Sequence, residues 1–451
     1  MMLIVVVVFA LLIGFFITSL QSLESAPIAN TPTLRQATSS PTATSAPAAV
    51  TSTPVPDESI WTQVQAARLF DQIAHQVETQ RALSPQAEVP LSFLDDGTMA
   101  ATLQDLYTKE DPESALLPFT ALGLVPSVPI SVQAHTPAGI YITAHQQLYV
   151  STGRPQDDPD AQALLAHAYV HALQDQHFDL EAVRARAQST DEKLAVQALI
   201  EGDATLVTAL YGSEDLSSVD WSALAALIVQ AEQPDYGESL SNHEAWSRLE
   251  QFPNSEGRAF AAALHEHGGW EALNSSYTDI PRSTEQILHP ARYLGSDSPT
   301  GEPDRPTRVV VPDLDSVLSD EWGLLLEDTL GEFVVGLYLN RAMPAQAAWR
   351  AADGWDGDKF VVWEREDGQR IVVWRTIWSS SREASDYERG LSLLIPQRYY
   401  PVRPIDPPQG LSGRWWETSE GTVNVRRTAR YVLSTHAPDT NTAVNVVKAL
   451  P

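Results

Sequence analysis

Two histidines four residues apart are the side chains in this sequence best placed to do chemistry together. His167 and His171 lie in the segment DPDAQALLAHAYVHALQDQ, whose apolar spacing predicts a helix. On a helix this spacing puts both imidazoles on one face, one turn apart, as two ligands of a single zinc ion require. Pairs of histidines also occur on helices that bind no metal, so the interpretation depends on a third ligand.

Glu201 is the best candidate for that third ligand, because catalytic zinc is held by three protein side chains and one water molecule. It follows His171 by thirty residues and lies in DEKLAVQALIEGDATLVTALYG, a second predicted helix. The first helix is predicted to open at Asp158 and the second at Thr190. An antiparallel pair of helices joined by a short loop would bring Glu201 over the histidines.

Together the two segments resemble a known family of zinc enzymes. LAHAYVHALQDQHFDL followed by ALIEGDATLV is similar to zinc peptidases of the gluzincin type, whose motif is HExxH with a downstream glutamate as third ligand. More loosely, the chain from Trp61 to Leu394 resembles uncharacterised exported prokaryotic proteins with segments like STEQILHP and GWDGDKF. The resemblance implies a zincin-like fold and zinc ligation by His167, His171 and Glu201.

Ala168 departs from that motif at the position directly after the first histidine. The family's glutamate there takes a proton from the zinc-bound water and passes it to the leaving amine, a role worth about 10²- to 10⁴-fold in rate. Alanine can do neither. Zinc alone still lowers the pKa of its water to about 7, so slow residual hydrolysis stays open, whereas efficient peptide hydrolysis is not expected.

Three further residues are candidates for supporting roles. Asp175, one turn beyond His171, is expected to be an outer partner that orients an imidazole N–H. Asp203, two residues past Glu201, is a second outer candidate and the carboxylate considered as a substitute base. His289 is a candidate oxyanion stabiliser, because such sites often use His or Tyr for that purpose.

Strands are predicted on both sides of the two helices. In GIYITAHQQLYVST a polar stretch separates apolar runs at 140–142 and 148–150, which predicts a hairpin before the first helix, and VPLSFL predicts another strand. Near the C-terminus, KFVVWERE and QRIVVWRT flank Asp367-Gly368, a strong hairpin signal. RWWET and TVNVRR predict a further strand pair.

Helical patterns dominate the middle of the chain, including GRAFAAALHEH, STEQIL and a long helix predicted around EDTLGEFVVGLYL. With the resemblance, the expected fold class is α+β: a mainly helical, zincin-like domain over residues 58–451. A small sheet or hairpin is expected beside the two helices, and β-hairpins at the C-terminus. Whether the part after about residue 356 forms a subdomain is left open.

The first 57 residues differ in composition from the rest. Leu3–Leu20 is almost wholly apolar, about the minimum for a membrane-spanning helix, and residues 1–21 are predicted as an uncleaved anchor. Residues 22–57, rich in Ser, Thr and Pro, are predicted as a flexible stalk. We therefore expect a single-pass membrane protein with an extracytoplasmic domain; secretion after signal cleavage is the alternative.

Charge and cysteine content narrow the chemistry further. The 58 acidic against 29 basic side chains give a formal net charge of -29, which repels nucleic acid and anionic headgroups. The absence of cysteine excludes disulfides, thiolate metal sites and a cysteine nucleophile, so any metal is held by His, Asp or Glu. A peptide or protein is the expected kind of ligand, and the sequence indicates no oligomeric state.

Three functional hypotheses follow from these observations. The leading one is an extracytoplasmic zinc-binding metallopeptidase homologue with impaired catalysis, acting as a binding or regulatory pseudoenzyme. The second is an active zinc-dependent protease with a non-standard general base. The third is a metal-free surface module for adhesion or scaffolding.

Overall fold

The computed structural model describes residues 63–109, 112–125, 137–153, 158–211, 240–314 and 316–450. The predicted anchor at 1–21 and the predicted stalk at 22–57 lie outside these residues. Within the described ranges, no helix combines the length and the apolar character needed to cross a membrane.

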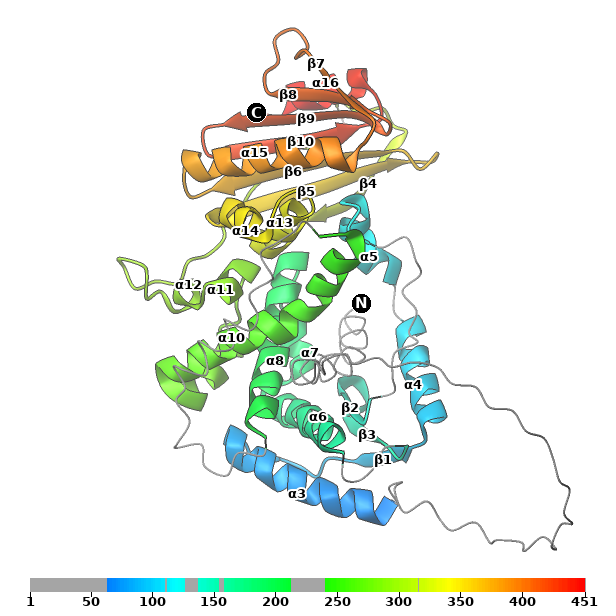
Figure 1. Cartoon of the computed structure of the whole chain (residues 1–451), viewed down its shortest axis with the longest axis vertical. Coiled ribbons are helices and arrows are strands. Elements are labelled where there is room, and N and C mark those ends of the chain that lie inside the picture. Colours follow the sequence, from blue (N-terminus) through cyan, green and yellow to red (C-terminus); the bar gives the residue numbers. More distant parts are fainter. Residues whose placement is uncertain are drawn as a thin grey trace, which may run out of the picture.

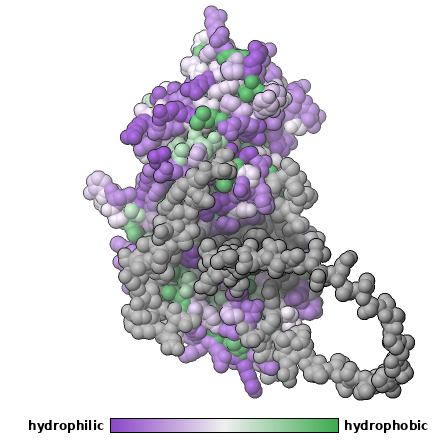
Figure 2. Space-filling view, in the orientation of Figure 1, coloured by the Kyte–Doolittle hydropathy of each residue, from purple (hydrophilic) through white to green (hydrophobic). Residues whose placement is uncertain are grey.

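Helices and strands are arranged in two regions of the molecule. Figure 1 shows a seven-stranded sheet with its covering helices at one end, and a set of helices with a three-stranded sheet toward the other. The expected mixture of helices, a small sheet and C-terminal antiparallel strands is therefore confirmed. Figure 2 shows that the visible face of the described residues is mainly hydrophilic, with hydrophobic side chains in small separate patches.

The three-stranded sheet packs beside the helix that carries the histidines. β2 (Gly139–Ile142) and β3 (Gln147–Ser151) pair antiparallel, and a short 3-10 helix, η1 (Thr143–His145), joins them. The hairpin predicted from GIYITAHQQLYVST is therefore confirmed. β1 (Leu91–Leu94) pairs parallel with β3, which gives the strand order β1-β3-β2.

α6 (Pro159–Phe178) carries both histidines and begins where the sequence predicts. The carboxylate of Asp158 accepts the N–H of Asp160, and Pro159 occupies the first turn, where a missing N–H breaks no helical hydrogen bond. Where a plain short loop is predicted to follow, the chain forms a further helix, α7 (Leu180–Ala185).

α8 (Thr190–Leu210) carries Glu201 and is fixed by its first turn to the region of the large sheet. Ser189 and Glu192 form a capping box at its start. The backbone N–H and the hydroxyl of Thr190 donate to the two carboxylate oxygens of Asp328, at 2.8 and 2.6 Å. Because Asp328 ends a strand of the large sheet, the helix of the third candidate ligand and that sheet share a junction.

Two glycines allow α8 to approach a neighbouring helix backbone to backbone. α10 (Asn242–Ser276) crosses α8, and a Cβ atom on Gly202 would stand 2.1 Å from the carbonyl oxygen of Gly257. A Cβ atom on Gly257 would in turn stand 2.2 Å from the carbonyl oxygen of Ala198. Only glycine permits contact this close, so the crossing sets the position of α8 in the core.

The large sheet is built from seven antiparallel strands, β4 (Trp322–Asp328), β5 (Trp355–Arg365), β6 (Arg370–Trp378), β7 (Val402–Ile405), β8 (Arg414–Thr418), β9 (Gly421–Thr428) and β10 (Tyr431–Ala437). Their order is β4-β5-β6-β10-β9-β8-β7. Both predicted hairpins are confirmed, since the chain turns between β5 and β6 at Asp367-Gly368 and β8 pairs with β9. The two hairpins join one sheet rather than standing apart.

The first strand of this sheet corrects the sequence prediction. A long helix is predicted around EDTLGEFVVGLYL, but Leu326–Asp328 pairs with β5, and the helix, α13 (Gly331–Asn340), begins only after it. The buried carboxylate of Asp358 accepts the N–H groups of Leu330 and Gly331, which fixes the start of α13. Pairing with β5 thus overrides the local helical pattern.

Opposite faces of the sheet pack against different helices. Trp374 belongs to the apolar cluster that includes α15 (Ser381–Arg398), whereas its neighbour Val373 belongs to the cluster that includes α16 (Thr440–Ala449). This is the alternation expected of a strand buried on both faces. The sheet therefore has an apolar layer on each side.

The remaining helices surround these elements, and α3 packs against α6. Non-helical φ/ψ angles at Gly268 and Gly269 interrupt α10, directly after the predicted helical segment GRAFAAALHEH. The helices not yet described are α3 (Gln63–Arg81), α4 (Asp96–Lys109), α5 (Pro112–Ala121), α11 (Thr284–Leu288), α12 (Pro290–Leu294) and α14 (Ala345–Ala352).

Candidate metal centre

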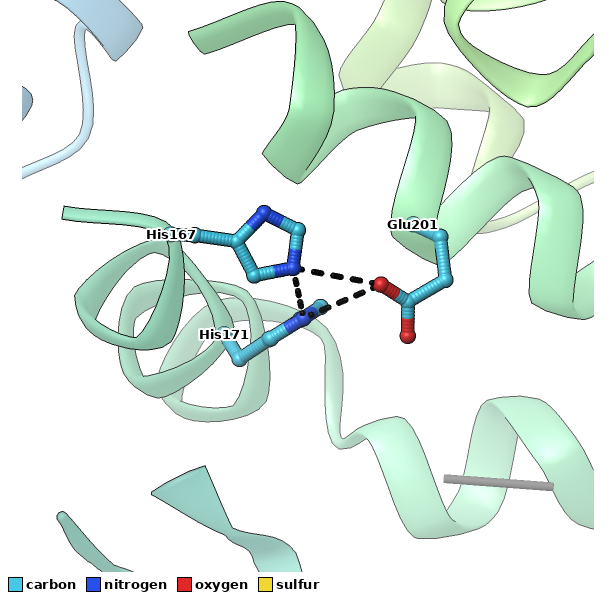
Figure 3. A group of neighbouring side chains, drawn as sticks. All are labelled: His167, His171 and Glu201. Carbon is cyan, nitrogen blue, oxygen red and sulfur yellow. Dashed lines mark hydrogen bonds and ion pairs between the residues drawn. The ribbon is translucent and has the colours of Figure 1, made fainter. Parts of the chain in front are cut away.

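Three ligand atoms from α6 and α8 converge between the helices (Figure 3). Nε2 of His167 lies 3.2 Å and Nε2 of His171 lies 3.4 Å from the same oxygen, Oε2 of Glu201. The two Nε2 atoms are 3.0 Å apart. Ligand atoms about 2.0–2.1 Å from a tetrahedral zinc ion are roughly 3.3 Å from one another. The residues predicted from the sequence therefore have the spacing of three corners of a metal tetrahedron.

A hydrogen bond to Gln174 orients the ring of His171 so that its Nε2 faces the other two candidate ligands. Nε2 of Gln174 donates to the carbonyl oxygen of Ile200 at 3.0 Å, which turns its Oε1 toward Nδ1 of His171 at 2.8 Å. An amide oxygen only accepts, so the proton of the neutral imidazole is on Nδ1. The lone pair on Nε2 then faces the position a metal would take.

His167 is oriented in the same way. The hydroxyl of Thr208 donates to the carbonyl oxygen of Ala204 at 2.7 Å, so its oxygen accepts from Nδ1 of His167 at 3.3 Å. Burial lowers the pKa of His167 below its ordinary value. The imidazole is therefore neutral, as metal ligation requires.

Glu201 completes the set as a carboxylate. Nε2 of Gln197 donates to Oε1 of Glu201 at 2.7 Å, which leaves Oε2 toward the histidines. Burial acts to raise the pKa of Glu201, but the charge of His171 and the hydrogen bonds with both histidines outweigh it, so this pKa lies below its ordinary value. When both imidazoles are neutral and turn their Nε2 lone pairs inward, these hydrogen bonds are lost and three electron-pair donors face one another, an arrangement that a metal cation stabilises.

The centre is nearly closed to solvent. The exposed fractions of the side chains are 6% for His167, 14% for His171 and 5% for Glu201. Buried carboxylates and imidazoles without a bound cation are unfavourable, so burial adds to the argument for a ligated ion. His171 is the ligand with the widest access to solvent.

A buried guanidinium accompanies this centre. Arg184 of α7 is buried, and its Nη1 donates to Oγ1 of Thr143 at 3.3 Å. Burial lowers the pKa of Arg184, while attraction to Glu201 and then to Asp175 opposes that shift. Its positive charge therefore stabilises the carboxylates of this region.

Ala168 lies in packed core. It is 3% exposed and belongs to an apolar cluster that includes Phe70, Tyr141 and Leu148. The position that holds the general base in the resembled family is thus occupied by a small apolar side chain.

Asp175 and Asp203 are engaged differently from the outer partners that the sequence predicts. Oδ2 of Asp175 accepts the hydroxyl of Tyr141 at 2.8 Å, and its Oδ1 accepts the N–H of Leu180 at 3.0 Å. Oδ1 of Asp203 accepts Nε of Arg81 at 2.6 Å, and its Oδ2 accepts the hydroxyl of Tyr277 at 2.8 Å. The imidazole-orienting role expected of Asp175 and the outer role expected of Asp203 therefore stay predictions, and the hydrogen bonds just described give these two carboxylates other partners.

His289 lies in a different cluster from the two candidate ligand histidines. Its Nε2 is 2.9 Å from Oε1 of Glu332, and Asp353 completes this second group of convergent atoms. The guanidinium of Arg292 already contacts both carboxylates, at 3.6 and 3.0 Å. The oxyanion role expected of His289 stays a prediction, and this second group is an ion-pair network that contains its own cation, the Arg292 guanidinium.

Sequence reasoning missed the three side chains that orient the ligands. Gln174 follows His171 by three residues and Gln197 precedes Glu201 by four, so helical spacing could have indicated both. Thr208 reaches His167 from the other helix, and no local signal indicates it. Arg184 was also missed, because its contact depends on α7, which the sequence reading did not include.

A model of a domain of unknown function, DUF8575, matches residues 323–447. The match spans the large sheet from β4 to α16, so the candidate metal centre lies outside it. Comparisons with curated proteins and with solved structures found no match.

Proposed function

We propose that this chain is an extracytoplasmic, zinc-binding homologue of gluzincin metallopeptidases, with a zincin-like fold and with most of their hydrolytic activity lost. The observation that carries the proposal is the convergence of His167, His171 and Glu201 beside Ala168, where that family has its general base. The protein then serves to bind a peptide or protein at the cell surface rather than to cleave it.

Zinc fits the donor set better than the common alternatives. Two neutral imidazole nitrogens and one carboxylate oxygen suit zinc, whereas Ca²⁺ and Mg²⁺ prefer oxygen ligands throughout. Gln174, Thr208 and Gln197 each hold one ligand, as outer partners of zinc sites do. When bound, zinc supplies a Lewis acid that polarises a carbonyl group and acidifies a water molecule.

The loss of hydrolysis follows from the missing proton carrier. Ala168 neither accepts nor donates a proton. Asp203, the substitute considered from the sequence, is ion-paired with Arg81 and accepts the hydroxyl of Tyr277. This engagement supports a pseudopeptidase over a protease with a non-standard base.

The location outside the cytoplasm is also a proposal. It rests on the apolar run Leu3–Leu20 and the stalk at 22–57, both outside the described residues. We propose a single-pass anchor. N-terminal sequencing of the mature protein tests this, because a start beyond Leu20 would indicate cleavage and secretion instead.

A peptidase assay on three forms of the full-length protein tests the proposed function. Wild type, Ala168→Glu and Ala168→Gln are purified, loaded with zinc and incubated with quenched fluorescent peptides, with and without chelator. Glutamate restores a general base, whereas glutamine matches only its size. We expect chelator-sensitive turnover by Ala168→Glu, at least about 10²-fold above both other forms. Zinc content and circular dichroism verify that the compared forms are folded and loaded.

Two results on the wild type would overturn parts of this proposal. Brisk, chelator-sensitive turnover would contradict the loss of hydrolysis and favour the active protease. A folded wild type that binds no zinc would contradict the metal centre and favour the metal-free surface module.

A further inference from the structure

We propose that a hollow on the outer side of α6 is a second binding site, which takes an arginine or lysine side chain of a peptide segment. The hollow has a volume of about 680 Å³ and is lined by residues of α3, of the segment leading into β1, and by Tyr169 of α6. Tyr169 is two residues from each histidine, so it leaves α6 away from the face they share. The hollow and the metal centre are therefore separate sites on one helix.

The wall of the hollow is apolar and firmly packed. Phe70, Ala74, Val89 and Tyr169 line it, and all four belong to one buried cluster. The rings of Phe70 and Tyr169 meet edge to face, with centroids 5.2 Å apart. Such a wall packs well along the aliphatic stem of an arginine or lysine side chain.

The same hollow carries negative charge. Asp71, Glu78 and Glu88 line it; Asp71 and Glu88 are exposed and Glu78 is half-buried. The hydroxyl of Tyr169 donates to Oε1 of Glu78 at 2.7 Å, which fixes this carboxylate against the apolar wall. A guanidinium or ammonium group at the end of an apolar stem is complementary to this combination.

The net negative charge is unevenly distributed along the sequence, and the part of the chain that lines the hollow belongs to the acidic portion. Residues 1–322 contain 42 of the 58 acidic side chains and 14 of the 29 basic ones, whereas the region of the large sheet is nearly balanced. A hollow in the acidic region attracts cations at long range as well as by contact.

Size and geometry favour a peptide side chain over a metal ion. Among the described residues, two groups of side chains could hold a metal ion, one that includes His167 and one that includes His289. Neither group includes a carboxylate of the hollow. The negative groups are thus spread around the space rather than converged on a point. Pockets of about 300–1,000 Å³ hold small organic ligands, so this volume suits a side chain with its flanking backbone.

Titration of the full-length protein with two peptides tests this site. Acetyl-Ala-Ala-Arg-Ala-Ala-amide is compared with the same peptide carrying citrulline, which keeps the shape of arginine and removes its charge. Binding is measured at pH 8, where carboxylates are ionised and arginine keeps its charge. We expect the arginine peptide to bind about tenfold more tightly than the citrulline peptide.

Variants then locate the binding. The triple variant Asp71→Asn/Glu78→Gln/Glu88→Gln should abolish the preference for arginine, and the single variant Glu78→Gln, the mildest change, should reduce it. A matched triple, Glu266→Gln/Glu271→Gln/Glu302→Gln, removes the same charge from exposed positions outside the hollow and should keep the preference.

Three outcomes separate the possibilities. If both triple variants lose the preference for the arginine peptide equally, the preference comes from the overall charge of the protein and the proposal is overturned. Equal binding of the two peptides by wild type would also overturn it. His171→Ala should bind the arginine peptide like wild type, because the hollow does not depend on the metal centre. A failed zinc measurement and a failed peptide measurement are therefore distinct results.

Discussion

Gly202 of α8 and Gly257 of α10 touch through their backbones, directly beside Glu201, the carboxylate of the candidate metal centre. A Cβ atom on Gly202 would stand 2.1 Å from the carbonyl oxygen of Gly257. Glu201 precedes Gly202 in the chain, so this crossing determines where its carboxylate meets His167 and His171. The geometry of the centre thus depends on a glycine pair that no metal motif includes.

Replacing Gly202 tests this dependence. Gly202→Ala forces the two backbones apart, so we expect a loss of at least about 1–3 kcal/mol in the free energy of unfolding, together with weaker zinc binding. Urea unfolding and a zinc titration measure the two effects. Gly323→Ala is the control, because an added Cβ there would lie 3.8 Å from the nearest atom, the carbonyl oxygen of Glu364. Unchanged stability in Gly202→Ala would contradict the role of the crossing.

The outer hydrogen bond of His171 should matter for metal affinity more than for folding. Gln174→Met removes the acceptor 2.8 Å from Nδ1 of His171 while keeping the length of the side chain. We expect zinc affinity to fall about 10–100-fold, as measured by competition with a fluorescent chelator. Gln72→Met, on an exposed position of α3, is the control. Equal affinities in the two variants would show that Gln174 does not support the ligand.

The ion pair of Arg81 and Asp203 should act on stability rather than on hydrolysis. Both side chains are fully buried and their charged atoms are 2.6 Å apart. Asp203→Ala leaves a buried guanidinium uncompensated, so we expect a loss of about 3–5 kcal/mol in unfolding free energy. Arg81→Met/Asp203→Leu should recover much of that loss. Wild-type stability in Asp203→Ala would contradict the structural role.

The zinc-free protein should lose stability as the pH falls below about 6.5. Burial lowers the pKa of His167 from its ordinary value of 6.5, so below that pH the unfolded chain binds more protons at this residue than the folded protein does. This contribution to stability is present above pH 6.5 and is lost as the pH falls toward the folded-state pKa. Thermal unfolding across this range measures the slope, and His167→Gln should flatten it. Equal slopes in the two proteins would argue against a buried neutral His167.

The ligands themselves were predictable because short-range rules place them. Helical spacing puts His167 and His171 on one face, and the cap at Asp158 marks where their helix begins. The contact of these histidines with Glu201 requires only that the next long helix packs antiparallel beside the first. Asp367-Gly368 likewise determines its hairpin locally, because Gly368, with a φ of 79°, takes the left-handed conformation that closes the turn between Arg365 and Gln369.

Long-range contacts determine what the sequence reading missed. The segment Leu326–Asp328 extends strand β4 because β5 lies beside it, and the short apolar run Leu324–Leu326 does not by itself distinguish strand from helix. Asp175 matches the helical spacing of an outer ligand partner, yet Tyr141, on a strand 34 residues earlier, takes its oxygen. His289 contacts Glu332, which lies 43 residues further along the chain. Spacing along one helix contains no information about such partners.

Zinc content of four full-length proteins tests the central claim most directly. Wild type, His171→Ala, Glu201→Gln and the control His177→Ala are loaded with zinc, dialysed and analysed for metal by mass spectrometry. His177 lies on the same helix, but its ring contacts the carbonyl oxygen of Ser84, outside the centre. We predict about one equivalent of zinc in wild type and His177→Ala, and a large loss in the other two. No zinc in folded wild type, or equal zinc in all four proteins, would contradict the metal centre.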